Sequence, residues 1–589
     1  MRKLLLLFIS SITFFCSDAQ TIIRGQILDS LTNQPIAFAS IGIAGNNKGT
    51  ITNEQGVFII NADSLPIKLT IFYIGYESKI IAINSNSKGE LIIKLKQLTV
   101  NLKDIVVNAK NGDIIFKKAF KKLQDQKQFV YRSKSFFRLL TKNDDTCTEM
   151  IESFYDTWLC KSGIKYWELE HGRYALVKDY KEKEYAVSID LSLLTRYIDI
   201  LNIFQTEDIK YIPFVFDTKY FDHLVFNISS RFVSNENEIV KIDFYPVKKD
   251  KGKIFCNGSV YVNTKTFEVY RLVQQWSEWK NPIIHVVNPK KGIKNFKAGF
   301  DITFIPNKEH CMLINHIQSK INYDIIDINS EKLVHKVSTY SNLLFYDYAN
   351  RSEDVNMIPK DEDNSSDYSQ IEYRLYIKRF WDNNPVLAET PIEKNIREGF
   401  EKMGSFGKAF NNSNDTLELL KDGYKIWNKN RPLHLKDIPN KVSKSIRLDK
   451  LEMKWEGEEI GGLYSKIYFA WNCYNDSFYY VLIPLLDTKA TWLSEDFRKS
   501  QQIDLIYKMY FDMVEVYYMK FSSTLKKLNQ PCKKRKYIMQ EYDNINKSLY
   551  DQSLEMLKDC WGGSSEDERM KGAFNWERKI DEMLEQYKE

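Results

Sequence analysis

Short runs of β-branched and aromatic residues, separated by turn residues at nearly regular spacing, fill residues 21–109. Each run is too short for a stable helix, and its residue types favour extended backbone. The spacing predicts a β-sandwich of about seven strands. The runs are "IIRGQILD", "FASIGIAG", "GTITNEQGVFII", "IKLTIFYIG", "SKIIAIN", "GELIIKLK" and "KDIVVNA".

One tight turn within this region is predicted between Thr52 and Phe58. The side chain of Asn53 can bond the backbone two residues further on, and Gly56 can take a positive φ. These residues shape a turn and carry no chemistry.

The same stretch resembles a known family through "GQILDSLTNQPIAFASIGIAGNNKGTITNEQGVFII", "YIGYES" and "LKDIVV". Over residues 22–107 it resembles the carboxypeptidase-like regulatory domain, a prealbumin-like sandwich that precedes the plug of many TonB-dependent receptors. Asn53 stands where the family usually has Asp, and Asp104 where it usually has Glu. The resemblance implies a folding and interaction module without catalytic residues.

The N-terminal residues predict export. Arg2 and Lys3 precede an apolar stretch over residues 4–16, and small residues follow up to Ala19, which predicts a signal peptide over residues 1–19. Cys16 is an alternative site for a lipid anchor, but Phe15 stands where a lipobox has a small residue. No later run approaches 18 uncharged apolar residues. We therefore expect an exported protein, in the periplasm or associated with the outer membrane of a Gram-negative bacterium.

A second β-rich region is expected over residues 110–400. It begins with a short amphipathic helix at 113–126, whose apolar residues are Ile114, Ile115, Ala119, Phe120 and Leu123. More than 200 residues of strand-like runs follow, and they predict a long antiparallel sheet that curls toward a half-barrel or a second sandwich.

This β-rich region also carries a resemblance of its own, through "FKKAFKKL", "FFRLL", "IESFYDTW", "GSVYVNTKTFEVYRL" and "RFWDNNPVLAETPIEKNI". Over residues 110–398 it resembles an uncharacterised group of exported envelope proteins. That group implies neither an activity nor catalytic residues. The hairpin in the fourth motif is also similar to the half-barrel of lipoprotein carriers, at the level of fold alone.

The charge pattern does not indicate a nucleic-acid partner. The net charge is +6, from 84 basic and 78 acidic residues with the signs interspersed. The single compact basic run, "KKRK" at 533–536, is predicted to be a solvated loop.

Histidine and cysteine give no metal site by spacing. His310, Cys311 and His316 are the tightest group, but on a strand the two histidines lie about 20 Å apart and cannot share an ion. Outside the expected signal peptide, seven cysteines are scattered over the chain, so we expect mostly buried thiols with one or two disulfides.

One acidic segment, "DEDNSSDYSQIE" at 361–372, places oxygen-bearing side chains at the spacing of a calcium loop. Ser366 replaces the glycine that the turn of such a loop needs, so we predict a solvated linker there. The sequence contains no GxSxG, Walker, dinucleotide or HExxH motif. We predict no catalytic, cofactor-binding or metal-ligating residue and no cofactor.

The C-terminal region, residues 445–589, follows a predicted linker over 401–444 and reads as an α+β domain. After a few strands, a long helix is expected to begin at Ser494 as its N-cap, with Glu495 and Asp496 in the first turn. Apolar residues then recur every three or four positions and predict one buried face; they are Ile503, Ile506, Tyr510, Met513, Tyr517, Phe521, Leu525 and Leu528.

This region resembles a family of secreted zinc-dependent protease-like domains. The resemblance rests on Trp492, "RKSQQIDL", "QEYD" at 540–543 and "WERKIDEML" from Trp576. Carried over by position, the zinc histidines fall on Arg498 and Gln502, and the general base falls on Lys499. These side chains cannot rebuild a zinc-hydroxide site, so the resemblance implies a pseudoenzyme.

The sequence leads to three hypotheses about function. The first is a non-enzymatic envelope protein that binds a protein, glycan or lipid partner. The second is a periplasmic lipid or lipoprotein carrier that uses an apolar concave face of the middle sheet. The third is a hydrolase with an unrecognised C-terminal site, in which Glu495 or Asp496 would be essential.

Overall fold

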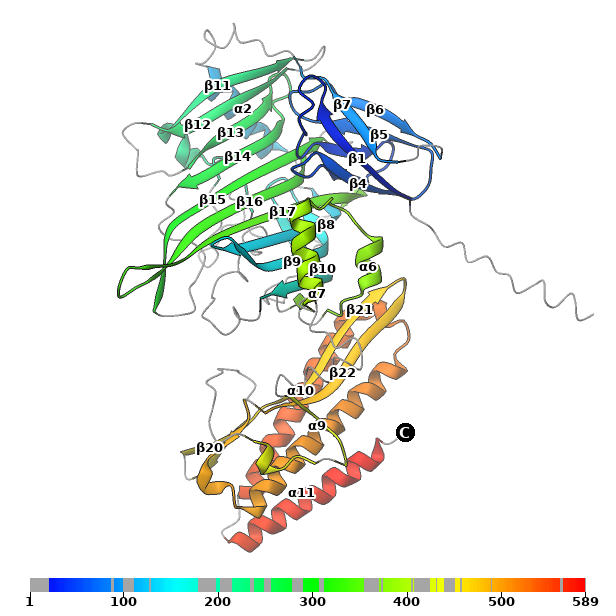
Figure 1. The fold of residues 1–589 in the computed structure, drawn as a ribbon, viewed down its shortest axis with the longest axis vertical. Helices are drawn as coiled ribbons and strands as arrows, with labels where there is room; N and C mark the ends of the chain where they lie inside the picture. Colours follow the sequence, from blue (N-terminus) through cyan, green and yellow to red (C-terminus); the bar gives the residue numbers. More distant parts are fainter. Residues whose placement is uncertain are drawn as a thin grey trace, which may run out of the picture. The chain divides into compact units, whose positions relative to one another are not determined.

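The computed structural model divides into two compact units: unit 1 comprises the residues up to 371 with 378–406, and unit 2 comprises 372–377 with 407–589 (Figure 1). The described residues are 21–85, 89–98, 111–126, 129–177, 198–201, 214–233, 238–247, 256–277, 290–306, 312–353, 370–371, 374–403, 406, 424–430, 432–438, 451–455, 458–488, 490–561 and 565–587. Several predicted features lie outside them: the signal peptide with Cys16, the run 103–109 with Asp104, His310, Cys311 and most of 361–372.

The first part of unit 1 is the predicted seven-strand sandwich. One sheet has the order β4 (Val57–Ala62), β1 (Thr21–Asp29), β7 (Leu91–Leu95), and the other has the order β3 (Gly49–Ile51), β2 (Ser40–Ile43), β5 (Ile67–Phe72), β6 (Lys79–Ile83). Ile27, Phe58 and Leu69 are fully buried between the sheets. The predicted turn is confirmed, because the Asn53 Oδ1 accepts hydrogen bonds from the backbone N–H groups of Gln55 and Val57, and Gly56 has a φ of +71°.

The rest of unit 1 is built on one curled antiparallel sheet of ten strands, as the sequence predicts. In spatial order its strands are β10 (Ile164–Leu176), β9 (Thr146–Leu159), β8 (Val130–Asn143), β17 (Leu333–Glu353), β16 (Met312–Asp327), β15 (Lys291–Pro306), β14 (Val269–Ser277), β13 (Cys256–Asn263), β12 (Glu238–Pro246) and β11 (Leu224–Val233). The long-range step places β17 beside β8, which brings the two ends of the region together.

One face of this sheet is apolar and holds the main core of unit 1. Helix α2 (Gly112–Asp125) packs on it near β11 and β13 (Figure 1). The short 3-10 helix η2 (Thr218–His223) precedes β11. The predicted helix face is partly wrong: Ile114 is exposed, whereas Phe116 is fully buried. Phe116 completes an i, i+3, i+4, i+7 stripe with Ala119, Phe120 and Leu123, so it is this stripe that meets the sheet.

The opposite face of the sheet is more polar and is covered from two directions. The sandwich lies against β16 and β17, where the Asn47 amide donates to the Tyr348 carbonyl and the Asn315 amide donates to the Ser40 hydroxyl. Helix α6 (Lys378–Asn383) and helix α7 (Pro391–Lys402) cover the part made by β8, β9 and β10 (Figure 1).

Unit 2 combines two small sheets with three long helices. The sheets have the orders β18 (Tyr424–Ile426), β22 (Ser477–Asp487), β21 (Ser465–Tyr474) and β19 (Leu451–Trp455), β20 (Glu458–Leu463), β23 (Trp492–Leu493). The helices are α9 (Gln501–Lys527), α10 (Arg535–Trp561) and α11 (Glu566–Gln586). The short 3-10 helices η5 (Leu435–Asp437), η6 (Glu495–Phe497) and η7 (Pro531–Lys533) connect them.

Helix α9 begins later than the sequence predicts. Ser494 makes no side-chain cap, and Glu495 and Asp496 lie in η6. Ser500 is the true N-cap, because its hydroxyl accepts a hydrogen bond from the Ile503 backbone N–H. The Ser494 N–H instead donates to the Ile460 carbonyl, which ties this segment to β20 and delays the helix.

The predicted apolar face of α9 is confirmed as buried, with Leu528 only partly so, but it is not the only buried face. Met509, Val514 and Val516 are also buried, because α9 is packed between the sheets on one side and α10 and α11 on the other. The helix therefore forms the centre of unit 2.

One disulfide joins Cys473 of β21 to Cys532 of η7, in keeping with the predicted one or two bridges. Cys147, Cys160, Cys256 and Cys560 are free thiols. Among the described helices, none has the length and apolar character needed to cross a membrane. The described part of the chain contains no cluster of three His, Cys, Asp or Glu side chains placed to hold a metal ion.

Candidate binding cleft

Strand register determines which side chains meet on the polar face of the large sheet. Arg138 of β8 lies opposite Glu152 of β9, and Glu152 lies opposite Arg173 of β10. Successive residues of a strand point to opposite faces, so these three side chains form a row on the same face. Three neighbouring strands thus bring one carboxylate between two guanidinium groups.

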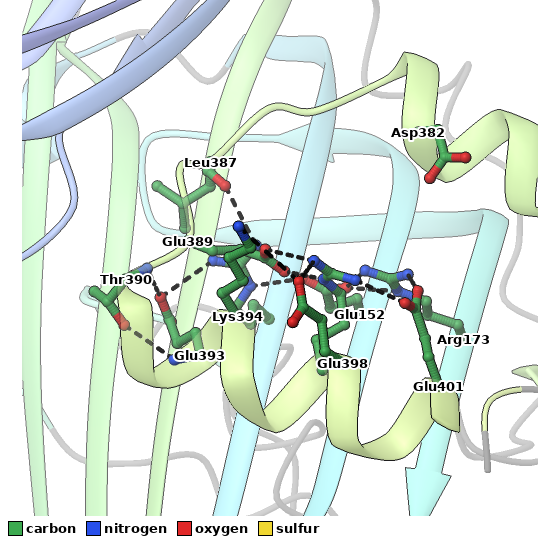
Figure 2. A network of polar contacts seen from close by, with 12 residues as sticks. Glu152, Arg173, Asp382, Leu387, Glu389, Thr390, Glu393, Lys394, Glu398 and Glu401 are labelled. Carbon is green, nitrogen blue, oxygen red and sulfur yellow. Dashed lines mark hydrogen bonds and ion pairs between the residues drawn. The ribbon is translucent and has the colours of Figure 1, made fainter. Parts of the chain in front are cut away.

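The row forms a buried ion network beneath α7 (Figure 2). The Glu152 carboxylate is fully buried and accepts from Arg138 Nε and Arg173 Nε, each at 2.6 Å. Burial alone would raise the pKa of Glu152, but the charges of Arg173 and Arg138 together outweigh it and lower that pKa. Glu152 is therefore ionised, and its position is fixed.

Helix α7 is attached to this row by both of its ends. Near its start, Glu393 lies 3.6 Å from Arg138 Nη1, and near its end Glu401 lies 3.7 Å from Arg173 Nη1 (Figure 2). Thr390 and Glu393 form a reciprocal capping box, which fixes where the helix begins. The network thus sets the height and direction of α7 above the sheet.

The segment 384–390, which we name the strap, joins α6 to α7 and contacts the sandwich. The Thr50 hydroxyl donates to the Val386 carbonyl at 2.8 Å, and the Asn61 amide donates to the Pro385 carbonyl at 3.2 Å. The Arg138 Nη2 donates to the Leu387 carbonyl, so the ion network and the sandwich hold the same short segment.

A cleft of about 230 Å³ lies between the sandwich, the polar sheet face, the strap and α7. Its apolar lining is Phe38, Leu140, Leu387, Ala388, Ile392 and Ile396, and its polar lining is Asn53, Glu54, Lys142, Lys320, Ser338, Tyr340, Asn342, Thr390 and Glu393. The volume is slightly below the range of about 300–1,000 Å³ that is usual for small-molecule pockets. The cleft suits a small ligand or one part of a larger partner.

Two lysines give the cleft a positive charge. Lys142 and Lys320 are exposed, and neither forms an ion pair with a carboxylate of the described residues. Lys142 lies opposite Ser338 and Lys320 opposite Tyr340, so their Cα atoms are on the order of 12 Å apart across β17. The free acid in the lining is Glu54, because Glu393 already contacts Arg138.

Tyr340 stands between the two lysines and remains a neutral phenol. Its hydroxyl accepts a hydrogen bond from Gln318 Nε2 at 2.8 Å, and burial raises its pKa. The ammonium group of Lys320 lies 5.5 Å from the centre of its ring. The floor of the cleft therefore offers one aromatic face and hydroxyl groups between two cations.

His316 is the one member of the predicted histidine–cysteine group that the structure describes. It is buried on β16, its Nε2 lies 2.9 Å from Asn342 Oδ1, and its ring stacks on Phe38 with centroids 5.3 Å apart. Burial lowers the pKa of His316 to about 4, so the ring is neutral. It supports the contact between sandwich and sheet.

The residues at the protease-like positions of unit 2 are separated by structure as well as by chemistry. Arg498 precedes α9, whereas Gln502 lies in its first turn and its amide donates to the Cys560 carbonyl at 2.7 Å. Lys499 is exposed. Trp576 is buried in α11 and donates to Asp559. Gln502 and Trp576 thus tie α9 and α11 to α10.

The cleft was not predicted from the sequence. The segment "RFWDNNPVLAETPIEKNI" contains one local signal, because Thr390 with Glu393 is a capping signature that predicts the start of α7. Asn53 was predicted to shape a turn, and its side-chain amide additionally contacts the Ala388 carbonyl at 3.4 Å. No local signal places Lys142 and Lys320 on the same surface.

Comparison with known families identifies one domain. Residues 23–107 match the CarboxypepD_reg-like domain, which agrees with the sandwich and its turn. This match covers less than half of the chain, so it names the N-terminal domain and leaves the rest of the protein unassigned. No comparison supports the zinc-protease resemblance of unit 2, and a search of the curated proteins found no match.

Solved structures were also compared. A DUF1329 family protein from Desulfovibrio piger is 10% identical, covering 44% of this chain and 97% of its own, with a TM-score of 0.19. A LolA superfamily protein from Nitrosomonas europaea is 11% identical, covering 42% and 98%, with a TM-score of 0.17. A membrane-associated protein of unknown function from Bacteroides fragilis is 9% identical, covering 56% and 99%, with a TM-score of 0.11. Scores this low carry no argument about function.

Proposed function

We propose that the chain is a non-enzymatic binding protein of the cell envelope, and that its ligand occupies the cleft between the sandwich, the sheet and α7. The ligand chemistry follows from the lining: an apolar part against Leu140, Ile392 and Ile396, and an acidic group between Lys142 and Lys320. A lipid or another amphipathic acid has this composition.

The observation that carries the proposal is the pair of lysines without acidic partners beside an apolar wall. A structural lysine gains stability from an ion pair with a carboxylate, and neither of these lysines forms one with a described carboxylate. The walls are also rigid in a way that suits binding, because the buried network and the capping box fix α7 before any ligand arrives.

The experiment is displacement of the fluorescent anion 8-anilinonaphthalene-1-sulfonate by decanoate, measured on the purified chain. We expect saturable binding, and displacement at least tenfold weaker in the Lys142→Gln, Lys320→Gln double variant. Both lysines are exposed, so the variant should fold normally. Ile392→Ser should weaken binding by a smaller factor, because Ile392 is an exposed part of the wall.

The matched control is the Lys68→Gln, Lys79→Gln variant, which removes two exposed lysines from the sandwich away from the cleft. It should bind like the unchanged protein. Equal binding by all variants, or no saturable binding, would overturn the proposal. Native mass spectrometry of protein isolated from the envelope distinguishes a bound lipid from a protein partner by mass.

The carrier alternative places a lipid on the apolar face of the same sheet. The described rings on that face contact one another: Phe116 stacks on Phe226 at 4.3 Å, and Tyr155 stacks on Trp167 at 4.3 Å. They therefore act as core. The hydrolase alternative rests on Glu495 and Asp496, which are exposed in η6. No specific contact favours either alternative over the cleft.

A further inference from the structure

The turn between α9 and α10 gathers an unusual concentration of positive charge. Residues 516–540 contain seven basic side chains and no acidic one, although the whole chain has a net charge of only +6. The cations are Lys520, Lys526, Lys527, Lys533, Lys534, Arg535 and Lys536. The rest of the protein is therefore close to neutral, and this tip carries the excess.

The fold places these charges together at one end of a helical hairpin. Helix α9 ends at Lys527 and α10 begins at Arg535, so the end of one helix and the start of the next present their cations side by side. The Cys473–Cys532 disulfide fixes the connecting turn to the β21–β22 hairpin. We name this surface the basic tip: residues 526–537 with the hairpin residues 474–480.

Five cations of the basic tip have no ion-pair partner among the described carboxylates. Lys527, Lys533, Lys534, Arg535 and Lys536 form no ion pair with the described carboxylates. The nearby acid in the hairpin turn is Asp476, which is exposed and likewise unpaired. Five unpaired cations against one acid leave a strongly positive surface.

Helix electrostatics account for only part of this arrangement. Cations suit the C-terminus of α9, but they oppose the partial positive charge at the N-terminus of α10, whose first turn contains no acidic residue. The run at 533–536 is thus neutral or unfavourable for stability, and its position is better explained by an external anion.

Aromatic side chains surround the cations. Tyr537 follows the basic run and is 45% exposed, and Tyr479 and Tyr480 of β22 are 42% and 38% exposed. Strand β22 contacts η7, and Tyr480 lies opposite Trp471, on the strand face that it shares with Cys473 and its disulfide to η7, whereas Tyr479 points to the opposite face. Exposed tyrosine beside lysine and arginine is the composition that suits the headgroup region of a bilayer, where a ring enters the interface and a cation meets a phosphate.

We propose that the basic tip docks unit 2 on a membrane surface rich in anionic phospholipid. The sequence alone predicts a solvated loop at 533–536, because a short run of four cations is usually a solvated surface segment. The structure adds the neighbouring cations of α9, the disulfide that fixes the turn, and the exposed tyrosines. A nucleic acid fits less well, because the cations form a compact tip and not a stripe that follows a phosphate backbone.

The test is co-sedimentation of the purified chain with vesicles. Vesicles of phosphatidylcholine with 30% phosphatidylglycerol should bind the protein at low salt and release it at high salt, and pure phosphatidylcholine vesicles should not bind it. The quadruple variant Lys533→Gln, Lys534→Gln, Arg535→Gln, Lys536→Gln should bind at least tenfold more weakly. Its thermal unfolding should match that of the unchanged chain.

The matched control replaces four exposed lysines of α2, Lys117, Lys118, Lys121 and Lys122, with glutamine. It removes the same charge and should keep full vesicle binding. Equal losses in both variants would overturn the proposal, because net charge alone would then explain binding. Displacement by millimolar glycerol phosphate, or tighter binding of a single-stranded oligonucleotide, would also overturn it. The cleft lysines are unchanged in both variants, so failure here leaves the proposed ligand site untouched.

Discussion

Units 1 and 2 are stabilised by opposite uses of polar groups. Unit 1 buries charges and pairs them, as in the Arg138–Glu152–Arg173 row beneath α7. Unit 2 places a helix with an extensive buried apolar surface, α9, at its centre and links β21 to η7 with a disulfide. Paired buried charges specify geometry more than they add stability, whereas apolar burial and a disulfide add stability with little geometric demand. Unit 1, whose buried ion pairs require a specific geometry, is the unit that holds the cleft.

The same contrast applies to single buried groups. His316 of unit 1 is buried as a neutral ring. Glu515 of α9 is buried in unit 2, and its burial, with the nearby charge of Asp512, raises its pKa to about 7. Acid therefore acts on the two units in opposite directions.

The largest expected effect comes from breaking the ion row. Glu152→Gln leaves two buried guanidinium groups without their carboxylate, so the free energy of unfolding of unit 1 should fall by about 3–5 kcal/mol. Hydrogen–deuterium exchange resolves the two units separately, and unit 2 should not change. Glu398→Gln, which removes a more exposed carboxylate of α7, should cost about 0.5 kcal/mol or less. Equal effects from both variants would show that the buried row has no special role.

The next effect concerns the disulfide of unit 2. Cys473→Ser with Cys532→Ser opens a loop whose ends are 59 residues apart, and the chain-entropy model gives a loss of about 4 kcal/mol. Urea denaturation should show this loss in unit 2 alone. Cys147→Ser, at a free thiol of unit 1, serves as the control. A loss below about 1 kcal/mol would mean that the packing of α9 is sufficient without the bridge.

Lowering the pH should change the stabilities of the two units in opposite directions. The pKa of His316 is about 4 when folded and near 6.5 when unfolded, so unit 1 loses on the order of 3 kcal/mol as the pH falls from 6.5 to 4. Glu152, whose pKa is lowered by its arginines, acts in the same direction. For Glu515 the folded pKa is raised, so its contribution is complete at low pH and is lost as the pH rises toward 7.

Denaturation at a series of pH values checks this prediction. His316→Gln should reduce the loss of stability of unit 1 between pH 6.5 and 4. Glu515→Gln should reduce the loss of stability of unit 2 as the pH rises toward 7. If the stabilities of the two units changed with pH in the same direction, the predicted opposite response to acid would be wrong.

The smallest effect tests the start of α9. Ser500→Ala removes the N-cap hydrogen bond to Ile503 and should destabilise unit 2 by about 1 kcal/mol. Ser494→Ala should leave the stability of unit 2 unchanged within about 0.5 kcal/mol, because Ser494 makes no side-chain cap. A larger effect at Ser494 would favour the earlier helix start that the sequence predicts.

Local patterns in the sequence were sufficient for much of the fold. Strand runs with their turn residues predicted the sandwich, and Asn53 and Gly56 do what their chemistry predicts at the turn. Apolar spacing predicted the buried face of α9. Errors arose where a distant segment changed the local outcome: Phe116 meets a sheet about a hundred residues further on, and Ser494 bonds Ile460 in place of capping a helix.

The cleft required the tertiary structure. Arg138, Glu152 and Arg173 are aligned only because β8, β9 and β10 pair in one register. That register includes irregularities at Thr141/Lys142 and Leu169/His171, which the lengths of the turns in the sequence do not predict. Lys142 and Lys320 lie on either side of β17, a strand that pairs with β8 from almost two hundred residues further along the chain. Thus the sequence by itself determined the kinds of element and their buried faces, which depend on local periodicity. The structure decided the binding surface, because strand partners far apart in the chain define which side chains share a face.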